Sequence, residues 1–129
     1  MTIQEFESKY NEKYRLFLID NSGIGRLKIR AYAASEALPV SGLKVIVSTM
    51  IDNQKVIFFE GYTDRSGMIE TLSLPAPVFD SDNLIVPNSI TYSVTAYDHE
   101  QLLHEYTVNM YDDVCVVQTI YAVGGINGY

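Results

Sequence analysis

Hydrophobic and polar residues alternate along most of the chain after residue 25. In residues 26–34, Leu27, Ile29 and Ala31 alternate with polar or aromatic side chains, which is the period-two pattern of a half-buried strand. Six further segments rich in Val, Ile, Thr and Tyr follow, separated by turn-forming residues such as Gly, Asp, Asn and Pro. Strands at this spacing predict an all-β sandwich, with seven strands over residues 26–34, 43–51, 55–64, 68–74, 90–98, 102–111 and 114–123.

The alternation also predicts which side chains meet between the two sheets. Residues at every second position of a strand share one face, and the more apolar face is expected to point inward. The residues expected in this core are Leu27, Ile29, Val45, Val47, Phe58, Ile69, Leu72, Val94, Val108, Val116 and Ile120.

The N-terminal segment has a different pattern, with apolar residues three or four positions apart. This spacing predicts a helix over residues 2–14, and Thr2 with Glu5 matches a capping box at its start. An extended arm is the alternative, because short isolated helices are marginally stable. Residues 15–20 are expected to form a short strand or arm. The apolar stripe on the segment supplies four candidate contacts with a partner: Ile3, Phe6, Tyr10 and Tyr14.

The length of 129 residues suits one domain with its own hydrophobic core, and 47% of the residues are apolar. We expect an N-terminal arm over residues 1–22, a β-sandwich domain over 23–123 and a C-terminal tail over 124–129. The first residues lack the basic start and apolar segment of a signal peptide, and no apolar run approaches the ~18 residues of a membrane helix. We therefore expect synthesis in the cytoplasm and residence in a virion-like or other large particle.

Charged residues are divided unevenly along the chain, which has a net charge of −7. All nine Lys and Arg residues lie within residues 1–65, together with eight acids, whereas residues 66–129 carry eight acids and no Lys or Arg. An acidic chain without a basic run argues against binding to nucleic acid or to anionic membranes, because both depend on positive charge. Either the fold mixes the two halves and the bias averages out, or the molecule has one acidic face.

Patterns that would indicate catalysis or metal binding are weak. His99 and His104 flank a predicted turn beside several acids and could bind a divalent metal, but an exposed hairpin is the simpler interpretation. Residues 80–83 resemble the start of a calcium loop without its central Gly and distal Glu. The lone Cys115 lies in an apolar run and is expected to be buried. We expect no enzyme activity, no catalytic residue, no metal and no cofactor.

A series of short motifs runs through the first half of the predicted sandwich. In chain order they are Gly-x-Leu-x-hydrophobic, Pro-hydrophobic-x-Gly, an alternating strand, Thr-Asp-x-x-Gly and Leu-Pro, at Gly25–Ile29, Pro39–Gly42, Leu43–Val47, Thr63–Gly67 and Leu74–Pro75. These residues resemble the carboxypeptidase regulatory-like, or transthyretin-like, domain. The resemblance covers residues 23–123. It is closest to versions found in Firmicutes beside spore-cortex or peptidoglycan-binding modules, and in phage-like structural proteins.

The resemblance implies a seven-stranded Ig-like or transthyretin-like β-sandwich without a catalytic site. Asp64 is expected to bond backbone amides of the turn that ends at Gly67, where glycine suits a positive φ. A domain of this kind would be a structural or protein-interaction module in a phage, phage-like or spore-associated assembly. Its terminal segments would dock on neighbouring protein subunits, in a homo- or hetero-oligomer.

Tyrosine is unusually frequent, with ten residues and no tryptophan. Tyrosine fits half-buried strands, so most of these residues need no further explanation. Exposed rings could also stack on sugars, and a module that binds cell-wall glycan, such as peptidoglycan, is therefore the alternative function. The candidate residues for glycan contact are Tyr32, Tyr62, Tyr92 and Tyr97.

Two placements of the N-terminal apolar stripe are open. The arm could fold back on its own domain, or it could dock on a neighbouring molecule. The uneven charge favours docking, because copies stacked head to tail would set bases of the arm against acids of the second half. The residues that would meet in such a stack are Lys9, Lys13, Arg15, Asp98, Glu100, Asp112 and Asp113.

Overall fold

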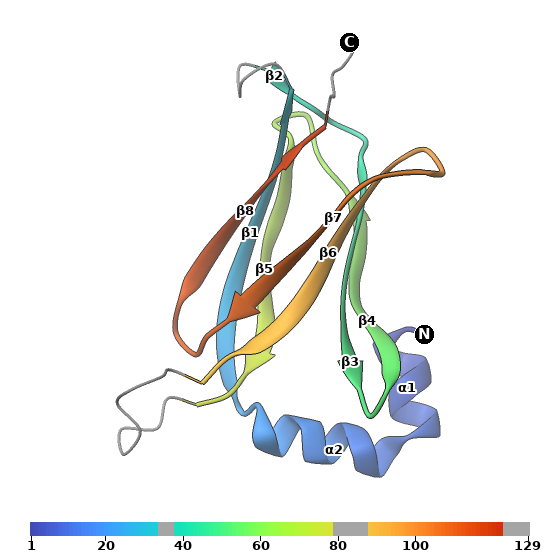
Figure 1. Ribbon diagram of the computed structural model, residues 1–129, viewed down its shortest axis with the longest axis vertical. Coiled ribbons are helices and arrows are strands. Elements are labelled where there is room, and N and C mark those ends of the chain that lie inside the picture. Colours follow the sequence, from blue (N-terminus) through green and yellow to red (C-terminus); the bar gives the residue numbers. More distant parts are fainter. Residues whose placement is uncertain (34–37, 79–87, 123–129) are drawn as a thin grey trace.

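The computed structural model describes residues 1–33, 38–78 and 88–122 and has two β-sheets packed face to face, with two helices at one end (Figure 1). The first sheet has the strand order β4-β3-β6-β7, and all of its neighbouring strands are antiparallel. Its strands are β3 (Lys44–Ile51), β4 (Gln54–Tyr62), β6 (Ile90–Asp98) and β7 (Gln101–Met110). The expected all-β sandwich is thus confirmed.

The second sheet is built around β1 (Gly23–Ala33). Along one side β1 pairs antiparallel with β5 (Met68–Ala76) and with the two-residue strand β2 (Leu38–Pro39). Along its other side β1 pairs parallel with β8 (Cys115–Tyr121). Strand β2 lies in a segment that the sequence predicts as a loop, so the described part of the chain has eight strands where seven were expected.

The core between the sheets follows the predicted alternation. Residues 23, 25, 27, 29 and 31 of β1 are buried, and the even-numbered positions between them are exposed or half-buried. Eight of the eleven residues expected in the core are buried, and Phe58, Leu72 and Val116 are half-buried against it. Burial of this apolar area is the main free energy that holds the two sheets together.

Two tight turns show how local sequence sets the strand order. Asp52 and Asn53 connect β3 to β4 with φ of 51° and 64°, the left-handed conformation that a two-residue hairpin turn requires. At the turn before β5, the Asp64 carboxylate accepts hydrogen bonds from the N–H groups of Ser66 (2.8 Å) and Met68 (3.0 Å). Gly67 has φ of 74°, and a Cβ there would lie 2.5 Å from the Ala31 carbonyl oxygen. The roles expected for Asp64 and Gly67 are confirmed.

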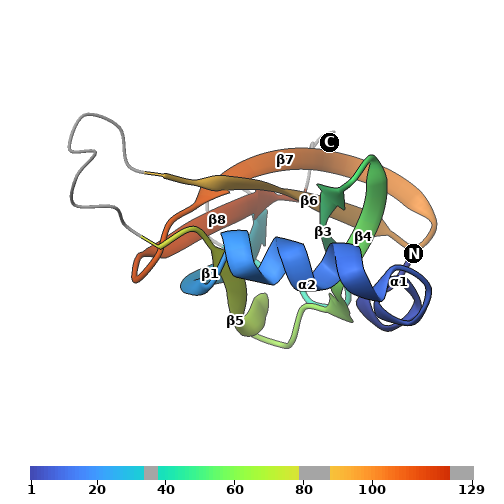
Figure 2. The same cartoon turned by 90° about the horizontal axis from the view of Figure 1, so that it is seen from below.

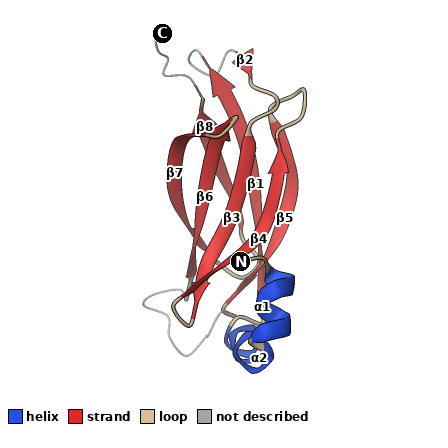
Figure 3. Cartoon of the chain, turned by 90° about the vertical axis from the view of Figure 1, so that its right-hand side faces the viewer, coloured by secondary structure: helices blue, strands red, loops and turns tan. Residues whose placement is uncertain are grey.

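The N-terminal segment forms two helices, α1 (Ile3–Lys9) and α2 (Asn11–Asp20), which meet at Tyr10. The Thr2 side chain accepts a hydrogen bond from the Glu5 N–H, and Glu5 accepts one from the Thr2 N–H, so the predicted capping box is present. Residues 15–20, expected as a strand or arm, belong to α2, which is a correction. Figures 2 and 3 show α2 lying across the end of the sandwich. Neither helix is long and apolar enough to cross a membrane.

Candidate interaction surface

The apolar stripe of the N-terminal segment packs on its own domain. Phe6 is fully buried and Phe17 nearly so, and together they cover Ile51 at the end of β3 and Val56 in β4. The other three residues of the stripe are half-buried around the same cluster: Ile3, Tyr10 and Tyr14. Docking of this stripe on a neighbouring subunit, which the charge pattern favoured, is therefore corrected, because its side chains are already covered in cis.

A continuous series of aromatic contacts connects the helices to the sandwich. The Phe6 ring lies 5.0 Å from Tyr10 and 6.4 Å from Tyr14, centroid to centroid. Tyr14 stacks on Phe17 at 6.2 Å, and Phe17 lies 5.9 Å from Phe58 of β4. Aromatic pairs at such distances stabilise beyond the area that they bury. The helices are therefore held on the sandwich as part of one folded unit.

The outer face of α2 carries the largest apolar side chains that the helices leave in solvent. Leu16, Leu18 and Ile19 are 49%, 38% and 58% exposed, although they flank the buried Phe17 in sequence. Successive helical residues point about 100° apart, so a run of four apolar residues covers every side of a helix. Only Phe17 of this run is buried against the sandwich. We call Leu16, Leu18 and Ile19 the outer α2 face.

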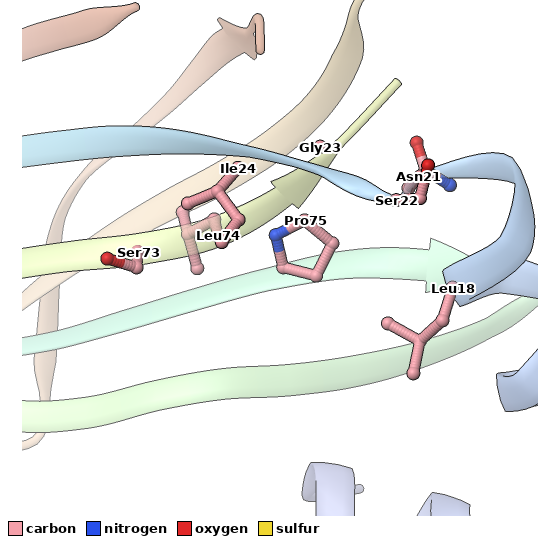
Figure 4. Close-up of a pocket in the computed structure, with 8 residues that line it drawn as sticks. All are labelled: Leu18, Asn21, Ser22, Gly23, Ile24, Ser73, Leu74 and Pro75. Atoms are coloured by element: carbon pink, nitrogen blue, oxygen red, sulfur yellow. The ribbon is translucent and has the colours of Figure 1, made fainter. Parts of the chain in front are cut away.

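Hollows on both sides of α2 extend this apolar surface. One, of about 280 Å³, is lined by Leu16 of the helix and by Met50 of β3, which is 60% exposed. The other, of about 410 Å³, lies between Leu18 and the paired strands β1 and β5. Figure 4 shows Leu18 there with the residues from β1, β5 and the end of the helix: Asn21, Ser22, Gly23, Ile24, Ser73, Leu74 and Pro75.

The charges of α2 are largely neutralised within the molecule. Lys13 pairs with Asp52 in the β3–β4 turn, and Arg15 pairs with Glu12 one turn earlier in the helix. The base of the sandwich is therefore not a basic surface that an acidic neighbour would recognise. Exposed ion pairs of this kind add little stability. Because these charges already have partners, apolar contact is the main interaction that the outer α2 face can offer.

The four tyrosines proposed for glycan contact lie in three different places. Tyr92 is fully buried in the core, which corrects its proposed role. Tyr32 is half-buried on the second sheet, with the Arg30 guanidinium over its ring at 5.5 Å. Tyr62 and Tyr97 are both in register with Lys44, on either side of it, so the three side chains share the outer face of the first sheet. We call Tyr62, Lys44 and Tyr97 the tyrosine row.

The electrostatics of the tyrosine row are set by one ion pair. The Lys44 ammonium lies 3.1 Å from the Glu60 carboxylate, which raises the pKa of Lys44. Tyr62 is 65% exposed, Tyr97 is half-buried, and a hollow of about 290 Å³ lies beside Lys44, Tyr97 and His99. Two aromatic rings that flank a charged pair are a suitable surface for a polar ligand with flat apolar faces.

Groups capable of chemistry are not assembled in the described part of the chain. Within residues 1–33, 38–78 and 88–122 no cluster of three His, Cys, Asp or Glu side chains is placed to hold a metal. His99 contacts Asp98 at 2.8 Å in the exposed β6–β7 turn, and His104 is exposed on β7. Residues 80–83 lie outside the described residues. Cys115 is exposed rather than buried, because it begins an edge strand.

The outer α2 face was missed at the sequence level. Four consecutive apolar residues after Arg15 suggest a strand, and a strand would have buried half of them. The useful observation would have been the helical spacing of Tyr10, Tyr14 and Phe17, which continues the stripe of α1 into α2. Extending the helix through Asp20 leaves Leu16, Leu18 and Ile19 off the stripe and therefore exposed.

Comparison with known proteins gives distant structural likenesses. No family model and no curated protein matches the chain. Among solved structures, transthyretin from Sparus aurata is similar, with a TM-score of 0.45 and 14% identity, over 74% of this chain and 89% of that one.

Proposed function

We propose that this protein is a non-catalytic structural module that docks on a neighbouring protein subunit through the outer α2 face. The observation that carries the proposal is the exposure of Leu16, Leu18 and Ile19 on one short helix at the end of the sandwich. These three side chains are already about half covered, so burying the rest would contribute roughly half of the ~1.5–3 kcal/mol that full burial of each is worth, before the costs of association. Lys13, Arg15 and Glu12 beside this face are paired within the molecule, so the partner is expected to present an apolar groove.

The proposed context is a large assembly, as in a phage, phage-like or spore-associated particle. The rigid attachment of α2 to the sandwich supports this role, because a preformed surface binds without the cost of ordering a free arm. The N-terminal segment would then pack on its own domain through the apolar stripe and dock on the partner through the outer α2 face. The absence of an enzyme activity stays a prediction.

Sedimentation of a tagged full-length chain from the cells that produce it tests this function. The wild-type chain is expected to sediment with a large assembly, and Leu16→Ser with Ile19→Ser is expected to remain in the soluble fraction. Leu102→Ser is the matched control, because Leu102 is 53% exposed on β7. Equal sedimentation of the double variant and the control would contradict docking through α2.

A second candidate function rests on the tyrosine row, which would take a sugar chain of cell-wall glycan. Tyr62 and Tyr97 are separated by two strand spacings, or about 10 Å, with Lys44 between them. Retention on insoluble peptidoglycan tests it: Tyr62→Ala and Tyr97→Ala should each lose retention, whereas Tyr32→Ala on the opposite sheet should keep it. No retention of the wild-type chain would eliminate this candidate.

A further inference from the structure

Among the described residues, strand β8 is the outermost strand of the second sheet on the side of β1 that faces away from β5. Edge strands present unpaired N–H and C=O groups, and proteins usually protect them with charges, proline, bulges or covering segments. The other edges of this sandwich have such protection. Strand β4 is covered by the chain start, where the Ile57 N–H donates to the Met1 carbonyl at 2.7 Å. Strand β7 has a register shift beside Leu103 and a charged Glu105.

The other side of the second sheet is protected in the same way. Strand β5 has a register shift opposite Leu27–Ile29 of β1, and it contains Glu70 and Pro75. Strand β8 lacks a register shift, a charge and a proline. It pairs with β1 without a register shift from Cys115 to Tyr121, and its sequence, Cys-Val-Val-Gln-Thr-Ile-Tyr, contains no charge and no proline. Such an edge is a template for another strand.

The hydrogen bonds to β1 show which groups of β8 face outward. The Arg26 N–H donates to the Val114 carbonyl, and the Ala122 N–H donates to the Tyr32 carbonyl. Because bonding alternates along a parallel pair, the even-numbered residues face β1 and the odd-numbered residues face the edge. The residues whose main-chain groups face the edge are Cys115, Val117, Thr119 and Tyr121.

Side chains provide hydrogen-bond partners only for the main-chain groups in the second half of β8. The Gln118 amide donates to the Thr119 carbonyl at 2.9 Å, and the Tyr121 N–H donates to the Tyr106 hydroxyl at 3.4 Å. No described residue contributes a corresponding bond at Cys115 or Val117, both of which are exposed, Val117 to 52%. The open stretch is therefore centred on Val117. The Thr119 carbonyl has a second lone pair and can accept another bond.

We propose that β8 pairs antiparallel with β8 of a second copy of this chain, about a two-fold axis at Val117. The axis places Val117 opposite its own copy and Cys115 opposite Thr119 of the partner. Apolar and β-branched residues opposite one another stabilise such pairs. The contact is isologous, so two molecules would close as a dimer with one continuous second sheet.

Charge supports a second copy in this orientation. Each chain carries a net charge of −7, but residues 114–122 contain no charge. The nearest charges on this face belong to Arg26, Lys28 and Arg30 of β1, which lie one strand spacing from the edge, in register with Cys115, Val117 and Thr119. Asp112 and Asp113 lie just before β8. An antiparallel pair keeps the acids of the two chains at opposite ends, whereas a parallel pair would place all four together. This contact is separate from the outer α2 face and does not depend on the function proposed for it.

The mass of the full-length chain in solution tests the proposal. Light scattering after size exclusion, over a wide concentration range, should show a species of twice 14.5 kDa. Val117→Lys should give a monomer with an unchanged circular dichroism spectrum, because it sets two like charges opposite each other at the axis. Thr71→Lys, on the exposed part of β5, is the matched control and should remain dimeric, as should Leu16→Ser with Ile19→Ser.

Cross-linking tests the register. Thr119→Cys should give disulfide-linked dimers through the native Cys115 of the partner under mild oxidation, because directly opposite residues lie about 5.5 Å apart between Cα atoms. Thr71→Cys should give none. A wild-type chain that is monomeric at every concentration, or a dimer that Val117→Lys leaves intact, would overturn the proposal.

Discussion

The rings of Phe58 and Tyr92 meet edge to face, with centroids 5.6 Å apart and planes at 87°. Phe58 also contacts Phe17 of α2, and the Tyr92 hydroxyl donates a hydrogen bond of 2.6 Å to the Pro75 carbonyl on β5. One set of contacts thus runs from the N-terminal helices through the first sheet to the second. The outer α2 face is consequently fixed relative to both sheets.

Loss of the Tyr92 hydroxyl should weaken the connection between the sheets. In Tyr92→Phe the Pro75 carbonyl loses its donor, and the free energy of unfolding should fall by about 1–2 kcal/mol. Urea denaturation measures this change. Tyr106→Phe is the control, because its hydroxyl makes only a 3.4 Å bond at the edge of β8, and its loss should cost less. Equal stability of Tyr92→Phe and wild type would show that the buried bond contributes nothing.

Tyr92 should also make stability depend on alkaline pH. Burial raises the pKa of Tyr92 well above its ordinary value of 10.0, so the folded state keeps this hydroxyl protonated where the unfolded state loses the proton. Stability from this group is therefore complete below pH 10 and falls above it, by up to about 1.4 kcal/mol per pH unit. Denaturation of wild type and Tyr92→Phe at pH 8 to 11 should show a shallower loss in the variant. An equal loss of stability with pH in the two proteins would show that Tyr92 is not the source of the pH dependence.

Removing the Phe6 ring should release α1 from the sandwich. Phe6 is fully buried against Phe17 and Val56, and truncation of such a residue to alanine costs about 3–5 kcal/mol. Phe6→Ala should therefore lower the melting temperature and increase hydrogen exchange across α1. Ser8→Ala, on the exposed side of α1, is the control. Unchanged stability of Phe6→Ala would indicate that the stripe does not pack in cis.

A charge between the two sheets should unfold the domain. Val45 is fully buried in the centre of the first sheet, where an aspartate would have no partner. Val45→Asp should therefore lose the cooperative thermal transition, which circular dichroism measures. Ile46→Asp, one position along on the outer half-buried face, should retain it. Similar behaviour of the two variants would mean that the inward and outward faces of β3 are assigned wrongly.

The strand pattern could be predicted because inward and outward residues alternate clearly along β1 and along the first half of β3. The helical end of the molecule could not be predicted in the same way. Which side chains of an apolar run are buried depends on the element that packs against them. Leu16–Ile19 suits a strand by composition, but it continues a helix that Phe6 and Phe17 anchor. Strand β2 is only two residues long, too short for any periodicity.

The candidate sites were predictable only in part. Tyr62 and Tyr97 were chosen from the sequence, but their common row depends on strand order, which no local pattern contains. Tyr92 was placed with them because its ring belongs to an apparently exposed position of β6. The hydroxyl reaches Pro75 across the core, so a polar atom is satisfied deep inside the sandwich. Cys115 was expected inside because its neighbours are apolar, whereas β8 exposes its outer face at the sheet edge.

Docking through the outer α2 face can be tested most directly by photo-cross-linking in the cells that produce the chain. A photoreactive phenylalanine analogue is placed at Ile19, and at Thr71 on β5 as the matched exposed control, in otherwise wild-type full-length chains. We expect one discrete protein adduct from position 19 and none from position 71. No adduct at position 19, or the same adducts at both positions, would contradict the proposed role of α2.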